Sequence, residues 1–174
     1  VIGAINGAAV GIGATMTLAM DFRLASEAAR FGFVFGKIGI VPEACSSWML
    51  PRLVGITQAL EWAYTGDIVD AATAQRTGLV KELLAPDQLL AAARALAHRL
   101  IDGKSPVAIA LTRQMLLRNS LQPSPLEAHY IESLAVFHAS QADGKEGVAA
   151  FLAKRPANFT SKASAMPPFY PWWP

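Results

Sequence analysis

The chain has 174 residues, of which 53% are hydrophobic and 16% are charged. This composition suits a globular domain with a buried core, and it excludes a disordered chain, which needs low hydrophobicity and a high net charge. The net charge of +2 provides no basic field, so nucleic acid is not an expected partner, and the single cysteine excludes a disulfide framework.

The first twenty residues carry no charged side chain. A run of this length could cross a bilayer, and three of its glycines have the four-residue spacing of a membrane-helix dimer face. However, Gly11 and Gly13 flank Ile12 and indicate a turn between two shorter elements. We therefore favour a buried strand at residues 1–5, a glycine-rich turn and a buried helix at about 14–19, with a membrane span as the alternative. A chain that opens inside a buried strand is expected to belong to a longer domain.

The next part of the chain, from residue 21 to 42, predicts short extended segments. Phe31, Phe33 and Phe35 recur at every second position and would share one face of a strand. The elements expected after them are a helix at about 43–64 with an interruption near 55, a short helix at 70–78 and a strand at 79–84.

The second half of the chain carries the signals of helices. A leucine and alanine stripe has the period of an amphipathic helix, and Ser105 followed by Pro106 is a typical helix start. Capping boxes begin at Ser124 and, in a looser form, at Asp143. The helices expected here lie at about 89–100, 106–117, 125–139 and 145–154.

The tail at residues 156–174 is rich in proline and aromatic residues. Its prolines exclude a helix or a central strand. Chain ends are usually free, whereas aromatic side chains favour docking on the protein or on a neighbour, and both alternatives stay open. The predicted division is therefore a core at 1–104, a helical region at 105–155 and this tail.

The turn around Ile12 is the first candidate site. Glycines let a ligand approach the backbone, and free N–H groups at a helix start attract negative charge. A dinucleotide fingerprint would need a third glycine where Met16 stands, so that match fails. An oxyanion site at the Ile12 N–H remains, and tight packing of helix on strand is the structural alternative.

Glu43 is the second candidate, because it is a carboxylate in an apolar stretch near Trp48. Its structural interpretation is an acidic residue in a first helical turn, and its functional interpretation is a general base or nucleophile. Cys45 is better explained as a small buried thiol, and the three histidines show no metal-ligand spacing.

Phe151 and Lys154 lie three residues apart on one predicted helical face, where the lysine could contact a phosphate or simply be solvated beside a core Phe.

Many segments in register, as far as Phe159, carry a common pattern. Together they resemble the crotonase family, the enoyl-CoA hydratases and isomerases. The segments that carry the resemblance are residues 5–13 (Ile-Asn-Gly-Ala-Ala-Val-Gly-Ile-Gly), 18–25, 31–32, 39–42, 50–55, 64–66, 78–80 and 145–156.

The resemblance implies an α/β fold: the later part of a crotonase-like spiral of ββα units, followed by C-terminal trimerisation helices that build a homotrimer or a dimer of trimers. It implies an acyl-CoA thioester as substrate, with the Ile12 N–H, between Gly11 and Gly13, as one oxyanion donor. The other donor and the segment around the adenine belong to an upstream part of the family fold. Phe151 and Lys154 match positions that touch CoA from a neighbouring subunit. No cofactor beyond the substrate's own CoA, no metal and no membrane partner are expected.

The departures from the family pattern decide the expected chemistry. Thr15 and Phe35 stand at the positions of the two hydratase glutamates and are expected to line the substrate, with Trp48 nearby. Glu43, in the Pro-Glu-Ala-Cys-Ser-Ser run, resembles the catalytic glutamate of peroxisomal-type isomerases that convert 3-enoyl-CoA to 2-enoyl-CoA. One carboxylate suffices there, since it takes a proton from C2 and returns it to C4.

Three alternatives stay open beside this isomerase. Glu43 could serve a hydratase that adds water to 2-enoyl-CoA, or it could attack a substrate covalently. From another class, the chain could be a non-catalytic CoA-binding or assembly protein on the same scaffold. A cytoplasmic location is expected, because a single thiol fits a reducing compartment. The resemblance implies a role in fatty-acid metabolism.

Overall fold

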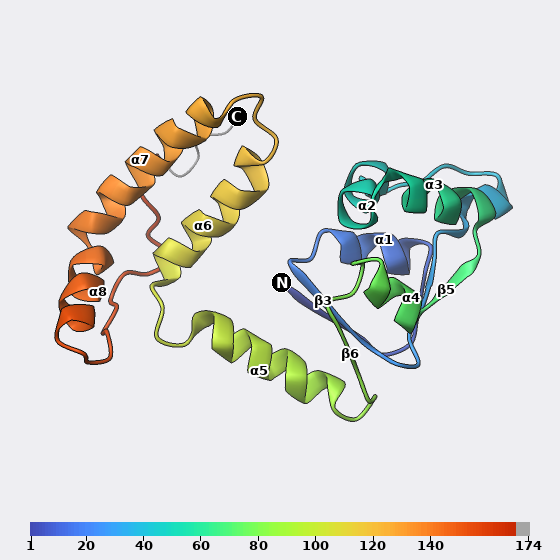
Figure 1. Ribbon diagram of the computed structural model, residues 1–174, viewed down its shortest axis with the longest axis horizontal. Coiled ribbons are helices and arrows are strands. Elements are labelled where there is room, and N and C mark those ends of the chain that lie inside the picture. The colour runs from blue at the N-terminus through green and yellow to red at the C-terminus, as the bar shows by residue number, and fades with distance from the viewer. Residues whose placement is uncertain (170–174) are drawn as a thin grey trace. The chain divides into compact units, whose positions relative to one another are not determined.

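The computed structural model describes residues 1–169, and the chain divides into two compact units, Val1–Ala97 and a second one that begins at His98 (Figure 1). The predicted division after residue 104 stays a prediction. The elements of the first unit are β1 (Ile2–Ile5), β2 (Ala8–Val10), α1 (Ile12–Leu18), β3 (Phe22–Ser26), β4 (Arg30–Gly32), the 3₁₀ helix η1 (Val34–Ile38), α2 (Ser46–Val54), α3 (Ile56–Thr65), β5 (Ile68–Asp70), α4 (Ala71–Arg76) and β6 (Glu82–Leu84). Helix α5 (Leu89–Ile101) leads from the first unit into the second.

The strands of the first unit form two small sheets. One has the order β1-β3-β6 with parallel neighbours, and the other has the order β2-β4-β5, in which β2 and β4 are parallel and β5 is antiparallel. The first four strands therefore alternate between the sheets, so that the β1-β2-α1 unit and the following β3-β4 pair each add one strand to each sheet. Parallel strands covered on both faces carry apolar side chains, which explains the uncharged start of the chain.

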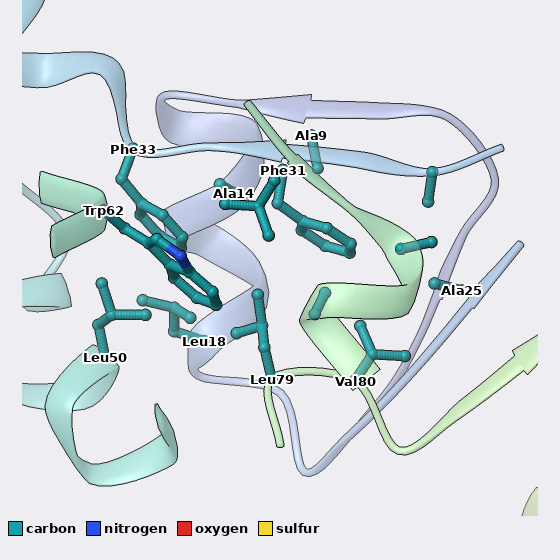
Figure 2. Packing of buried hydrophobic residues seen from close by; sticks show 14 of the residues in the cluster. Ala9, Ala14, Leu18, Ala25, Phe31, Phe33, Leu50, Trp62, Leu79 and Val80 are labelled. Carbon is teal, nitrogen blue, oxygen red and sulfur yellow. The ribbon is translucent and has the colours of Figure 1, made fainter. Parts of the chain in front are cut away.

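The core of this unit is made of side chains from both sheets and from the helices that cover them (Figure 2). Phe33 stacks on Trp62 of α3 with a ring-centroid distance of 5.8 Å and an interplanar angle of 4°. Phe31, Phe33 and Phe35 are all buried. The prediction that they share one strand face is wrong, because β4 ends at Gly32 and Phe35 lies in η1.

Several element boundaries differ from the predicted ones. The helix expected from Glu43 begins only at Ser46, because Ala44 and Cys45 adopt positive φ angles of 50° and 57°. The interruption near Gly55 is confirmed, since α2 ends at Val54 and α3 follows. The strand expected at 79–84 is shortened to β6.

The uncharged start of the chain forms two short strands and a short helix. In the part of the chain that the structure describes, no helix has the length and apolar character needed to span a membrane. The cytoplasmic location stays a prediction.

Arg23 connects the C-terminal end of α1 to the segment before β6. It is buried, and its guanidinium donates to the carbonyl oxygens of Thr17, Met20 and Leu79 at 3.2, 2.7 and 2.7 Å. Burial lowers the pKa of Arg23 below the usual range, and the nearby Asp21 carboxylate acts in the opposite direction. A buried cation is tolerated here because carbonyl oxygens at a helix C-terminus carry partial negative charge.

Replacing Arg23 with Met should lower the free energy of unfolding by about 2–4 kcal/mol, because buried carbonyls would lose their donors. Arg30→Met is the matched control, since Arg30 is exposed and its guanidinium binds the neighbouring carbonyls of Ala29 and Glu27. Urea denaturation of both variants measures the difference. Equal losses for the two variants would contradict the role of Arg23.

In the described part of the second unit, α5 is followed by α6 (Pro106–Asn119), α7 (Pro125–Gln141) and α8 (Asp143–Leu152). Ser105 and Ser124 cap α6 and α7, as predicted, by accepting from the N–H groups of Ala108 and Leu126. Met166 and Phe169 pack against a buried cluster of α6 and α7, so docking is confirmed for this part of the tail. Residues 170–174 of the tail lie outside the described residues.

The capping box expected at Asp143 is wrong, because α8 has no side-chain cap and Asp143 instead accepts from the N–H groups of Thr160 and Ser161. Burial raises the pKa of Asp143, but hydrogen bonds from Ser105, Ser161 and Thr160 outweigh it and hold the pKa below the usual range. Two carboxylates of α8 thus hold the chain that follows the helix, since Glu146 also accepts from the Asn158 N–H.

Glu146 makes stability in this segment pH-dependent. Hydrogen bonds from the Arg155 guanidinium and the Asn158 N–H lower the pKa of Glu146 from 4.5 to about 2. A carboxyl group whose pKa is lower in the folded than in the unfolded state stabilises the fold at pH values above the unfolded-state pKa. For Glu146 this contribution is lost as the pH falls from about 4.5 to about 2.

Amide hydrogen exchange at Asn158 should therefore be faster in Glu146→Gln than in the unchanged protein at about pH 6, and the difference should vanish toward about pH 2. Glu132→Gln provides the control, since Glu132 is an exposed carboxylate of α7 in the same unit. A difference that persists at the lowest pH would show that the Glu146 charge is not responsible.

Candidate active site

The turn before α1 has the conformation that its glycine permits. Gly11 adopts φ 57° and ψ −124°, which side chains disfavour, and its N–H donates to the Gly32 carbonyl at 2.9 Å. The chain then enters α1 at Ile12, two residues earlier than predicted. No acceptor for the Ile12 N–H is found among residues 1–169, as expected for a first helical residue. This N–H is available to a negatively charged oxygen.

Glu43 is held in place by its own backbone. Its carbonyl accepts from the Ser46 N–H at 2.9 Å and from the Ser46 hydroxyl at 2.5 Å. Ala44 and Cys45 between them occupy the left-handed region, where non-glycine residues are uncommon and cost about 1–3 kcal/mol each. The loop is therefore a defined strained turn that keeps Glu43 outside the helix, and the predicted role in a first helical turn is wrong.

The side chain of Glu43 reaches helix α1. The Thr15 hydroxyl donates to the Oε1 atom of Glu43 at 2.5 Å across 28 residues of sequence. Thr15 is only 1% exposed, whereas Glu43 is half-buried. Ile12 and Thr15 are three residues apart on one face of α1, so the structure brings the free N–H and the carboxylate to the same helical turn.

The other predicted residues lie as follows. Gly13 is the second residue of α1, and Phe35 is buried in η1. Trp48 on α2 is 42% exposed, and the Arg52 guanidinium covers its ring at 3.8 Å from the centroid, a cation–π contact. Cys45 is exposed, so its prediction as a buried thiol is wrong.

Phe151 and Lys154 belong to the second unit. Their predicted common helical face is wrong, because α8 ends at Leu152 and Lys154 has a φ of 52°. Phe151 is 83% exposed, which also contradicts the structural alternative of a core Phe. Among residues 1–169, no group of three His, Cys, Asp or Glu side chains could hold a metal ion.

Sequence reasoning found Ile12, Thr15 and Glu43 but missed how they are joined. The hydrogen bond between Thr15 and Glu43 crosses from one element to another, and no local pattern predicts it. The role of Ser46 was missed as well. A hydroxyl three residues after a carboxylate at a helix start was the available signal, because serine often binds nearby backbone carbonyls.

Comparison with known proteins gives a consistent result. The family model described as enoyl-CoA hydratase/isomerase matches residues 1–162. Enoyl-CoA hydratase ACTT3 of Alternaria alternata is 42% identical over 160 residues, which cover 91% of this chain and 53% of that protein. Crotonyl-CoA hydratase of Syntrophomonas wolfei is 38% identical over 164 residues, covering 93% and 62%. The solved structure of an enoyl-CoA hydratase subunit I from Geobacillus kaustophilus superposes with a TM-score of 0.85 at 34% identity, covering 92% and 62%.

The chain therefore belongs to the enoyl-CoA hydratase/isomerase family, which confirms the resemblance to crotonases. The mixed α/β fold with helices in the C-terminal part is confirmed as well. The chain spans between 53% and 62% of the length of these relatives. The particular likeness to peroxisomal-type isomerases stays a prediction.

Two glycine variants test the turn that presents the Ile12 N–H. Gly11→Ala should lower the free energy of unfolding by about 1–3 kcal/mol, because alanine resists the backbone conformation of Gly11. Gly13→Ala should instead raise it by about 0.5–1 kcal/mol, since alanine favours a helix. A Cβ atom meets nothing within 4 Å at either position, so steric crowding does not separate the two variants. Equal changes on thermal or urea denaturation would refute this reading of the turn.

Proposed function

We propose that the protein is an enzyme that acts on acyl-CoA thioesters and shifts the double bond of 3-enoyl-CoA to give 2-enoyl-CoA. The hydrogen bond between Thr15 and Glu43 carries this proposal, because it brings a carboxylate to the helical turn that begins with the free Ile12 N–H. A base and an oxyanion donor on one helical turn suit proton abstraction next to a carbonyl group.

The proposed reaction needs one proton and one carboxylate. Glu43 takes a proton from C2, and the electron pair of that C–H bond moves into a dienolate whose oxygen accepts from the Ile12 N–H. The dienolate then takes the proton back at C4, which places the double bond between C2 and C3. Charge is balanced at each step, and no redox partner or cofactor beyond the thioester's own CoA is needed.

Hydration of 2-enoyl-CoA is the second candidate. This reaction is favoured by the relatives reported above, since one is named an enoyl-CoA hydratase and another a crotonyl-CoA hydratase. In this alternative Glu43 would activate a water molecule. Kinetic assays of the whole protein with 3-enoyl-CoA and 2-enoyl-CoA separate the two reactions, since faster water addition than double-bond migration would favour the hydratase.

A homotrimer or a dimer of trimers is proposed as the assembly. Apolar side chains on two helices of the second unit support self-association, since exposed apolar surface of this kind marks interaction sites. These side chains have exposed fractions of 47% to 83%. They are Leu134, Val136 and Phe137 on α7, and Val148 and Phe151 on α8. Contact of Phe151 and Lys154 with the CoA of a neighbouring subunit belongs to the same proposal.

Glu43→Gln should lower kcat for 3-enoyl-CoA isomerisation by about 10²–10⁴-fold, because the amide cannot accept the C2 proton. Glu61→Gln is the matched control, since Glu61 is an exposed carboxylate on α3 that binds Gln58 at 2.9 Å. Steady-state assays of both variants in the whole protein measure the effect. Full isomerase activity in Glu43→Gln would exclude Glu43 as the acid and base.

A further inference from the structure

The two carboxylate oxygens of Glu43 have different surroundings. Oε1 accepts from the Thr15 hydroxyl at 2.5 Å, whereas no hydrogen-bond partner of Oε2 is found among the described residues. A carboxylate with one oxygen held and one oxygen free has a defined orientation. The free oxygen is then the one available to a bound molecule.

The Thr15 hydroxyl has one hydrogen to donate, and three acceptors lie near it. The carbonyl oxygens of Gly11 and Ile12 are each 3.4 Å away, beyond the usual distance of a good hydrogen bond, while Glu43 Oε1 is at 2.5 Å. A bond to an ionised oxygen is also shorter and stronger than one to a neutral carbonyl. The hydrogen of Thr15 is therefore assigned to Glu43.

Burial makes this contact rigid. Thr15 is 1% exposed, and the branched side chain of threonine has few rotamers in a helix. The Glu43 backbone is fixed separately by Ser46. Because Ile12 and Thr15 share one turn of α1, helix geometry, with a rise of about 5.4 Å per turn, sets how far the Ile12 N–H lies from the residue that holds Oε1.

We propose that Thr15 is a positioning residue, which holds Oε1 of Glu43 and leaves Oε2 as the atom that carries the proton from C2 to C4. This inference rests on the proposed isomerase function. Oε2 accepts the C2 proton while the C–H electron pair enters the dienolate, and the same O–H bond breaks when C4 is protonated. Thr15 keeps its own proton throughout.

The test compares two buried threonines of the same helix. Thr15→Val removes the hydroxyl that binds Glu43, and Thr17→Val removes a hydroxyl that donates to the Ala14 carbonyl at 2.7 Å. Thr15→Val should lower kcat for 3-enoyl-CoA by about 10–100-fold with KM changed less than about threefold, since a hydrogen bond to a charged group is lost. Thr17→Val should leave kcat unchanged.

Two further variants separate positioning from folding. Thr15→Ser restores a hydroxyl and should bring kcat back to within about threefold of the original value, because a serine hydroxyl can donate to the same oxygen. Thr15→Ala removes the hydroxyl without adding a methyl group beside the carboxylate, so it repeats the test if Thr15→Val does not fold. All are measured in the whole protein, beside Glu43→Gln.

The outcomes distinguish this inference from the proposed function. If Glu43→Gln is inactive while Thr15→Val or Thr15→Ala keeps kcat within about twofold, the positioning role is overturned and the isomerase stands. An equal fall of kcat in Thr17→Val would overturn it too, since the effect would then come from the helix as a whole. If Glu43→Gln keeps full activity, the proposed function itself fails.

Discussion

The buried guanidinium of Arg23 is the interaction on which the geometry of the first unit depends. It binds carbonyl oxygens at the C-terminal end of α1 and the Leu79 carbonyl, so one side chain joins the end of the first helix to the segment before β6. At the other end of α1, the Gly11 turn is bonded to the Gly32 carbonyl at the end of β4. A helix held at both ends can present an N–H and a hydroxyl in fixed positions.

Local sequence signals predicted the part of the site that is local. The glycines around Ile12 indicated the turn and the free N–H, because a strand-to-helix turn with positive φ needs glycine. The position of Glu43 could not be predicted in the same way. It depends on left-handed Ala44 and Cys45, which are not residues that favour that region, so the sequence indicated a helix that already begins near Glu43.

The same limit explains the errors in the second unit. Asp143 and Glu146 have the spacing of a capping box, yet their carboxylates bind chain that follows α8, through the Thr160, Ser161 and Asn158 N–H groups. A capping pattern shows only that an acidic residue can accept a hydrogen bond near a helix start. Which donor it meets depends on a return of the chain that lies beyond the pattern.

A carboxylate held through one oxygen is better suited to moving one proton than to adding water. Hydration must deliver a water oxygen to C3 and a proton to C2, which requires groups that orient the water as well as a group that transfers the proton. Thr15 has its one hydrogen engaged with Glu43, and Phe35 is a buried hydrocarbon side chain without a polar atom. Double-bond migration asks only that one oxygen reach C2 and C4 while the thioester oxygen is stabilised. The arrangement of Ile12, Thr15 and Glu43 meets that simpler requirement. This is the physical reason why double-bond migration is the proposed function and hydration the second candidate.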